Sequence, residues 1–265
     1  MEKTYGFIGC GNMGGTLAAC AAKAAGGSLI LVNDRDTSKA LALQEEWGAR
    51  AVGIRELAEK AYMIFLGVKP QMMEDMLGEI KDVLSSRKDR FVLVSMAAGL
   101  SVSDIRRMAG DLPVIRIMPN LAASVGEGMM LFCSEGVTEG ELDEFSELMK
   151  ESGKLSPLEE RLIDAASAVS GCGPAFVCMF IEALADGAVR CGLSRAQAML
   201  FAQQTLIGTA KVLMDTGRHP GELKDAVCSP GGTTIEGVLT LEDAGFRSAV
   251  SEAVISSYEK TLKLK

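Results

Sequence analysis

Three glycines near the N-terminus stand at the spacing that a nucleotide pyrophosphate requires. Gly9, Gly11 and Gly14 form a G-x-G-x-x-G pattern between an apolar strand expected at residues 5–8 and an alanine-rich helix. The first glycine permits a tight turn, the second lets the backbone approach a pyrophosphate, and the third allows the helix to pack closely on the strand. The free N–H groups and the dipole at the start of the helix then favour the phosphates. We therefore predict a dinucleotide site at this turn.

Two charged residues after the next strand bear on which dinucleotide binds. The strand SLILV follows the first helix, and Asp34 lies 20 residues after Gly14. Asp34 could accept hydrogen bonds from ribose hydroxyls, which favours NADH. Arg35 could bind a 2′-phosphate, which favours NADPH, or it could be a solvated surface charge. These two residues leave NADH and NADPH both open as the cofactor.

A second cluster, VCSPGGTTIEG at residues 227–237, interrupts a helical region. Its glycines permit a sharp turn with N–H groups that face one point, and Thr233 and Thr234 follow at a helix start. Such a helix start suits a carboxylate. The alternative is a helix capped by Ser or Thr after a glycine turn, but this alternative does not explain the whole cluster.

The elements that would position these groups alternate between strand and helix in the N-terminal part. Apolar strands are expected at residues 61–68, 91–99, 114–118 and 129–133, with helices between them. This alternation predicts an α/β fold, a Rossmann-type doubly wound parallel sheet, whose ligands bind beyond the carboxyl ends of the strands. The segments GVKPQ, SMAAG and MPN follow strands, so Lys69 and Asn120 are expected to point toward the cofactor. Thr138 and Glu141 have capping-box spacing at a helix start.

Only helices are expected after residue 160. The helix at residues 175–191 is apolar almost all round, interrupted by Glu182, Asp186 and Arg190. A helix without a polar face must be buried on most sides, which indicates a subunit interface. We predict a dinucleotide-binding domain at residues 1–160 and an all-helical dimerisation and substrate-binding domain at residues 161–265.

Composition excludes several classes of function. The net charge of the 265-residue chain is −8 without a Lys/Arg-rich block, which argues against a nucleic-acid partner. No secretory signal and no apolar run of membrane-spanning length are recognised, so no membrane partner is expected. The seven cysteines lack metal-ligand spacing, so we expect no metal, a small buried side chain at each cysteine, and a cytoplasmic location. The single histidine, His219, is interpreted as a helix cap or a surface residue.

The motif SPGGTTIEGVLTLEDAGFR, together with GCGPAF, MPN, VKP and GFIGCGNMGG, resembles the Δ1-pyrroline-5-carboxylate reductase family over essentially the whole chain. The resemblance implies reduction of the cyclic imine 1-pyrroline-5-carboxylate to L-proline, the last step of proline synthesis, with NADPH or NADH. It also implies a homodimer, which can assemble further into a decamer as a pentamer of dimers. Cys172 and Cys228 stand where the family usually has Ser or Thr, so any hydroxyl hydrogen bond there would be weakened.

The resemblance and the strand ends together define the expected site. Thr234 is expected to be catalytic through a hydrogen bond to the ring nitrogen. The expected substrate residues are Ser229, Gly231, Gly232, Thr233 and Thr234. The expected cofactor residues are Gly9, Gly11, Asn12, Met13, Gly14, Asp34, Arg35, Val68, Lys69, Pro70, Ala97, Gly99 and Asn120.

Two alternative functions remain to be weighed. A β-hydroxyacid dehydrogenase would carry a catalytic lysine within GxxGxGxxxK, whereas this chain has SGCGPAFVCMF there. A dinucleotide sensor without catalysis would not need the carboxylate loop.

Overall fold

A computed structural model describes residues 2–263, and the chain divides into two compact units. One unit holds the chain up to residue 171 together with the segment from residue 258 onward, and the other holds residues 172–257. The predicted boundary after residue 160 falls at the start of helix α7 (Glu160–Ser170), whereas the compact units divide at its end. That boundary therefore stays a prediction.

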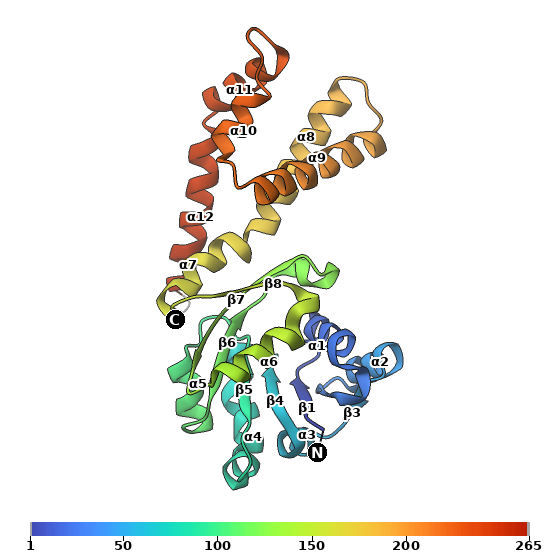
Figure 1. The fold of residues 1–265 in the computed structure, drawn as a ribbon, viewed down its shortest axis with the longest axis vertical. Coiled ribbons are helices and arrows are strands. Elements are labelled where there is room, and N and C mark those ends of the chain that lie inside the picture. The colour runs from blue at the N-terminus through green and yellow to red at the C-terminus, as the bar shows by residue number, and fades with distance from the viewer. Residues whose placement is uncertain (1, 264–265) are drawn as a thin grey trace. The chain divides into compact units, whose positions relative to one another are not determined.

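The first unit is built on an eight-stranded sheet with the order β3-β2-β1-β4-β5-β6-β7-β8. The strands are β1 (Thr4–Ile8), β2 (Ile30–Asn33), β3 (Arg50–Ala51), β4 (Ala61–Leu66), β5 (Val92–Ser95), β6 (Val114–Met118), β7 (Gly128–Glu135) and β8 (Gly153–Pro157). The expected doubly wound α/β domain is confirmed (Figure 1).

The expectation that every strand is parallel is wrong at one pair. β7 runs antiparallel to β6, whereas all other neighbouring pairs are parallel. Only residues 119–127 connect these two strands, and they include a 3-10 turn, η3 (Leu121–Val125). A parallel return needs a crossover of a dozen or more residues, so this short connection forces the antiparallel pairing.

Helices cover both faces of the sheet and bury two apolar clusters. α1 (Asn12–Ala25), α2 (Thr37–Trp47) and α6 (Glu139–Met149) contribute to one cluster. α3 (Ile54–Lys60), α4 (Met73–Ser86) and α5 (Val102–Ala109) contribute to the other. The expected capping box starts α6, because the Thr138 hydroxyl accepts the N–H of Glu141 and the Glu141 carboxylate accepts the N–H of Thr138.

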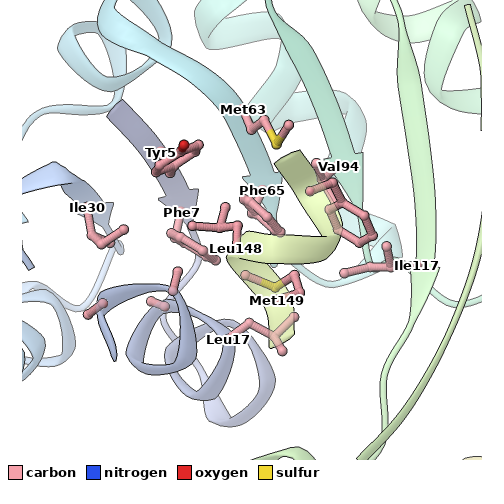
Figure 2. Close-up of a cluster of buried hydrophobic side chains, with 14 of the residues drawn as sticks. Tyr5, Phe7, Leu17, Ile30, Met63, Phe65, Val94, Ile117, Leu148 and Met149 are labelled. Atoms are coloured by element: carbon pink, nitrogen blue, oxygen red, sulfur yellow. The ribbon is translucent and has the colours of Figure 1, made fainter. Parts of the chain in front are cut away.

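Aromatic rings anchor the first cluster beneath the central strands (Figure 2). Phe7 of β1 lies opposite Phe65 of β4 in the parallel register, and their stacked rings are 4.3 Å apart. Phe145 of α6 packs against the Phe65 ring at 6.4 Å. Because Phe7 is fully buried, the strand that ends at the glycine turn is held rigidly.

The second unit is helical, as expected. Its helices are α8 (Gly173–Arg190), α9 (Arg195–Thr216), α10 (Pro220–Ala226), α11 (Thr233–Asp243) and the first part of α12 (Phe246–Leu262). α8 buries only Ala185 within the chain, and Met179 on it is 69% exposed. The unit therefore presents apolar side chains that a single chain leaves uncovered, as the interface interpretation requires.

Two expectations from composition need correction. The sequence was expected to contain no apolar run of membrane-spanning length. The stretch Glu160–Arg190 is nevertheless long and apolar enough to cross a membrane, judged by length and composition alone. The structure divides it into α7 and α8. The expectation that each cysteine is buried is also wrong, because Cys178 and Cys191 on and after α8 are exposed, whereas Cys10 and Cys20 are buried.

Candidate cofactor and substrate site

The glycine turn after β1 is constrained by the neighbouring backbone. Gly9 has a φ of +92°, which disfavours any residue with a side chain. A Cβ at Gly14 would clash with the carbonyl oxygen of Gly9, and a Cβ at Gly67, after β4, would lie 2.5 Å from the same oxygen. The ends of β1 and β4 and the start of α1 therefore meet at a distance that only glycine permits.

Gly11 is different, because no described protein atom lies within 4 Å of a Cβ placed there. It is the N-cap of α1, no side chain caps this helix start, and the first turn contains no acidic residue. The fold does not explain this glycine, whereas close approach of a phosphate does. The residues present therefore fit a dinucleotide.

A pocket of about 280 Å³ opens beside this turn, at the ends of β1, β2 and β4. Six of the expected cofactor residues line it: Gly9, Gly11, Asp34, Arg35, Val68 and Lys69. Asn12 lines a neighbouring pocket that shares Gly11. The structure thus brings together the glycine turn and the residues that follow the second and fourth strands.

Asp34 holds the glycine turn by its carboxylate. Its Oδ2 accepts the N–H of Cys10 at 2.6 Å, and its Oδ1 accepts the N–H of Asp36 at 2.9 Å. Cys10 is the residue between the first two glycines of the motif. Burial and the Asp34 charge raise the pKa of the Cys10 thiol to about 12, so the thiol is neutral and has no nucleophilic role at neutral pH.

The other expected cofactor residues do not line this pocket. Met13 packs against the apolar cluster, Gly14 and Ala97 are buried, Pro70 begins the short η2 turn (Pro70–Met72), and Gly99 has a φ of +79°. Their contact with cofactor stays a prediction.

Asn120 is engaged by protein at both ends of its amide. Its Nδ2 donates to the carbonyl of Ser170 at the end of α7 at 2.9 Å, and its Oδ1 accepts the N–H of Met129 on β7 at 3.2 Å. The MPN segment therefore fixes α7 to the sheet, and any contact of Asn120 with cofactor stays a prediction.

Sequence reasoning missed several residues that line the pocket. They are Ile8, Asn33, Lys39, Ile54, Gly67, Met72, Met76 and Glu79. Lys39 could have been recognised from the sequence. It follows Arg35 by four residues, in the first turn of the helix that comes after β2, and residues at this spacing lie on the same side of a helical segment. Glu79 could not have been recognised, because it comes from the middle of α4.

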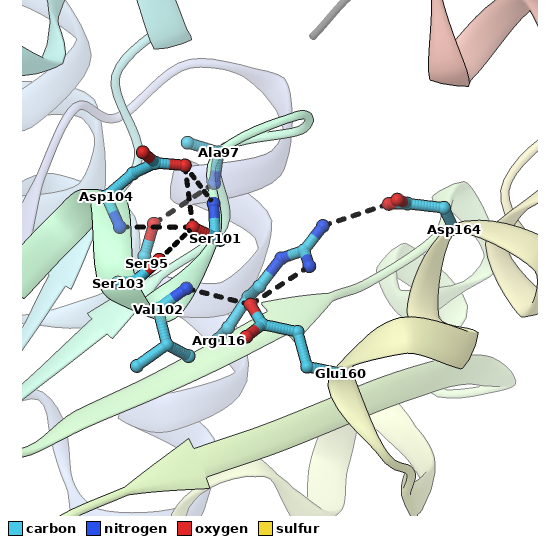
Figure 3. A network of polar contacts seen from close by, with 9 residues as sticks. All are labelled: Ser95, Ala97, Ser101, Val102, Ser103, Asp104, Arg116, Glu160 and Asp164. Atoms are coloured by element: carbon cyan, nitrogen blue, oxygen red, sulfur yellow. Dashed lines mark hydrogen bonds and ion pairs between the residues drawn. The ribbon is translucent and has the colours of Figure 1, made fainter.

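A network of polar contacts includes Ser95 and Ala97 of the SMAAG segment (Figure 3). Arg116 of β6 is 2% exposed and donates to Asp164 and Glu160 of α7 at 3.0 and 3.2 Å. The same Glu160 oxygen accepts the N–H of Val102 at 2.8 Å, at the first turn of α5. The network therefore ties α7 to the start of α5.

The C-terminal cluster forms the turn that the sequence suggests. Gly231 has a φ of +68°, the N–H of Gly232 bonds to the carbonyl of Ser229 at 3.0 Å, and a Cβ at Gly232 would clash with Ser229 Oγ. α11 then begins at Thr233 with no side-chain cap, and Thr234 occupies its first turn. Ser229, Thr233 and Thr234 are exposed. A helix start with free N–H groups beside two hydroxyls is suited to a carboxylate.

His219 does not belong to this turn. Its Nδ1 accepts the N–H of Gly221 at 3.1 Å and caps α10, which confirms the interpretation as a cap. Among residues 2–263, no group of His, Cys, Asp and Glu side chains is placed to hold a metal ion.

Two family models match the chain. The model described as pyrroline-5-carboxylate reductase dimerisation matches residues 160–264. The model described as NADP oxidoreductase coenzyme F420-dependent matches residues 4–99.

Similar proteins match over nearly the full length. The pyrroline-5-carboxylate reductase of Escherichia coli (strain K12) is 44% identical and covers 100% of this chain and 99% of its own. That of Aquifex aeolicus is 37% identical, over 98% of this chain and 96% of its own. The crystal structure of Plasmodium falciparum pyrroline carboxylate reductase with NADP bound has a TM-score of 0.85 and 31% identity, and covers 98% of both chains.

Proposed function

The chain belongs to the pyrroline-5-carboxylate reductase family, and we propose that it reduces 1-pyrroline-5-carboxylate to L-proline with NADPH as the cofactor. This is the final step of proline biosynthesis, and NADH is the alternative reductant. The observation that carries the proposal is the pair of open, uncapped helix starts, one at Gly11 and one at Thr233. One suits a pyrophosphate and the other a carboxylate.

The cofactor supplies a hydride, and the protein supplies binding and orientation. We assign the pyrophosphate to Gly11 and the first N–H groups of α1. The dinucleotide otherwise lies along the pocket that Asp34, Arg35 and Lys69 line.

We assign the substrate carboxylate to the loop at residues 229–234. Each charge-assisted hydrogen bond from an N–H or hydroxyl donor contributes roughly 1.5–3 kcal/mol, so several that converge give a submillimolar site. The anchored ring can then present its imine carbon to the reductant at a near-attack distance.

We assign Thr234 a hydrogen bond to the ring nitrogen of the substrate. A protonated imine is more electrophilic and already carries the proton of the product amine, so hydride addition at the carbon completes the reaction without a protein acid. The hydroxyl of Thr234 orients the nitrogen and does not need to transfer a proton. His219 is committed to the cap of α10, in keeping with this assignment.

Assembly and location are part of the proposal. The helical region belongs to a dimerisation domain, and we propose a homodimer through the apolar side chains of α8 that can assemble further into a decamer. A cytoplasmic location is supported by seven cysteines that are all free thiols. Neither a β-hydroxyacid dehydrogenase nor a non-catalytic sensor is favoured, because the full-length relatives are imine reductases by name.

The test of the proposal is direct. Purified protein is mixed with pyrroline-5-carboxylate and NADPH, or NADH, and the absorbance of the reduced cofactor is followed. We expect substrate-dependent oxidation. Oxidation of a 3-hydroxyacid with NADP, and none of NADPH by the imine, would instead indicate the dehydrogenase.

A further inference from the structure

Two of the three cationic side chains that line the cofactor pocket, Arg35 and Lys39, come from the segment that follows β2. Arg35 follows β2, and Lys39 stands in the first turn of α2. Both line the pocket that contains Gly11 and Asp34, and Lys39 also lines the neighbouring pocket on Gly11. A ligand group between them would meet two positive charges.

Neither cation is held firmly by a carboxylate. Lys39 Nζ lies 3.8 Å from Asp36 Oδ2, and the Lys39 side chain is 47% exposed. Arg35 Nη2 lies 3.7 Å from Glu79 Oε1, and the Arg35 side chain is 66% exposed. Exposed pairs at these distances contribute little, so both cations can turn to a stronger anion.

Asp34, the acidic residue directly before Arg35, is engaged elsewhere. Both of its oxygens accept backbone N–H groups, those of Cys10 and Asp36. Hydrogen bonds to two amides stabilise the carboxylate charge where it is. Asp34 therefore contributes to the shape of the phosphate-binding turn, and it offsets the two nearby cations only in part.

Glu79 is the remaining acid of this part of the pocket. It reaches the pocket from α4, and its carboxylate lies beside the Arg35 guanidinium, where an anionic group of a ligand would bind. A dianionic phosphate carries more charge and more acceptor oxygens than this carboxylate, so it would displace Glu79 from the guanidinium.

We propose that Lys39 is a specificity-determining residue of the cofactor site: together with Arg35 it binds the 2′-phosphate of NADPH, while Asp34 shapes the glycine turn and does not select for NADH. The inference rests on the proposed function in that it takes this pocket to hold the adenosine end of the dinucleotide. Glu79 is the competing anion that the 2′-phosphate replaces.

The experiment uses 2′,5′-ADP and 5′-AMP, which share the adenosine end and carry no nicotinamide. Binding of each to the full-length protein is measured by calorimetry. We expect wild type to bind 2′,5′-ADP more tightly than 5′-AMP. Lys39→Met should weaken 2′,5′-ADP by about tenfold or more, the size of one charge-assisted contact, and should leave 5′-AMP within about twofold.

Three further variants make the result specific. Lys39→Arg should restore most of the affinity for 2′,5′-ADP. Glu79→Gln should tighten 2′,5′-ADP and leave 5′-AMP unchanged. Lys23→Met is the matched control, because Lys23 lines only the neighbouring pocket and lies over the Trp47 ring, so neither affinity should change.

Equal weakening of both nucleotides by Lys39→Met would overturn the inference, and so would no weakening of either. A wild type that binds 2′,5′-ADP no better than 5′-AMP would overturn it as well. These outcomes are independent of the proposed reaction, which fails only if wild type does not reduce the imine with either cofactor.

Discussion

The guanidinium of Arg116 lies 3.0 Å from the carboxylate of Asp164, and both side chains are almost entirely withdrawn from solvent. The pair joins the central part of strand β6 to helix α7, and Glu160 extends it to the first turn of α5. A buried ion pair contributes little net stability compared with apolar packing, but loss of one partner leaves an uncompensated charge. The pair therefore fixes where α7 lies on the sheet.

Arg116→Met should lower the free energy of unfolding by roughly 3–5 kcal/mol, because the buried Asp164 carboxylate loses this counter-charge. Urea unfolding followed by circular dichroism measures the change. Arg116→Met combined with Asp164→Leu should recover much of the loss. Arg107→Met is the control, since Arg107 is 74% exposed in its pair with Asp104 and should change stability by less than about 1 kcal/mol. Equal effects at Arg116 and Arg107 would contradict the buried role.

Substitutions of Gly11 and Gly14 in the turn should have different effects. Gly14→Ala introduces a Cβ that clashes with the Gly9 carbonyl, so it should lower the melting temperature as well as cofactor binding. Gly11→Ala meets no protein atom within 4 Å, so it should leave the melting temperature nearly unchanged and weaken NADPH by about tenfold or more. Thermal melts with fluorescence titration of NADPH separate the two. If Gly11→Ala bound NADPH with full affinity, the assignment of the pyrophosphate to Gly11 would be wrong.

Acid should destabilise the protein partly through Glu141. Hydrogen bonds from Arg90, at 2.7 and 2.8 Å, are the main reason that the pKa of the Glu141 carboxyl falls to about 2, and the Thr138 N–H adds to them. Because this folded-state pKa lies below the unfolded value near 4.3, the stabilisation is complete above about pH 4.3 and is lost as the pH falls toward 2.

Glu141→Gln should therefore lower stability at pH 7 by roughly 1–3 kcal/mol and flatten the loss between about pH 4.3 and 2. Unfolding by urea across this pH range measures both effects. The control is Glu147→Gln on the same helix, since Glu147 is 71% exposed. Curves for Glu141→Gln and wild type that stay parallel down to about pH 2 would show that the Arg90 pair carries no acid sensitivity.

Assembly should depend on α8. Met179 is 69% exposed in the single chain, so Met179→Glu should leave the subunit folded and separate wild-type dimers or larger assemblies into monomers. Sedimentation velocity measures this. Leu41→Glu on α2 is the matched control, because Leu41 is also an exposed apolar side chain, at 53%, but lies outside the helical unit. A wild type that is monomeric at micromolar concentration would refute the interface.

Most of the first unit could be predicted because its central strands are continuous apolar runs that both faces bury. β4, with Ile64 and Phe65 fully buried on opposite faces, is such a run. β3 has two residues, and β8 contains Lys154 and Ser156, so neither has an apolar pattern to recognise. Their pairing depends on the strands beside them, which a local pattern does not encode.

The site was predictable where backbone geometry restricts residue type. Gly9 needs a positive φ and Gly14 has no room for a side chain, so glycine itself is the signal. The role of Asp34 was not predictable, because an acidic residue at this position gives the same pattern whether it binds a ribose or the N–H of Cys10. Glu79 enters the pocket from the middle of α4, whose packing only the fold determines, whereas Lys39 follows Arg35 by four residues and could have been recognised.

The most direct test is to measure L-proline formed and NADPH consumed from pyrroline-5-carboxylate, in wild type and in Thr234→Ala. This substitution leaves Gly231 and Gly232 of the turn unchanged. Under the proposed assignment it removes one hydrogen bond to the reacting ring. Wild type should form one L-proline for each NADPH. Thr234→Ala should lower kcat/KM for the imine about ten- to a hundredfold with an unchanged NADPH dissociation constant. If wild type formed no L-proline, the proposed reaction would be contradicted. If Thr234→Ala kept full activity, Thr234 would have no role in the reaction and the loop would be an ordinary helix start.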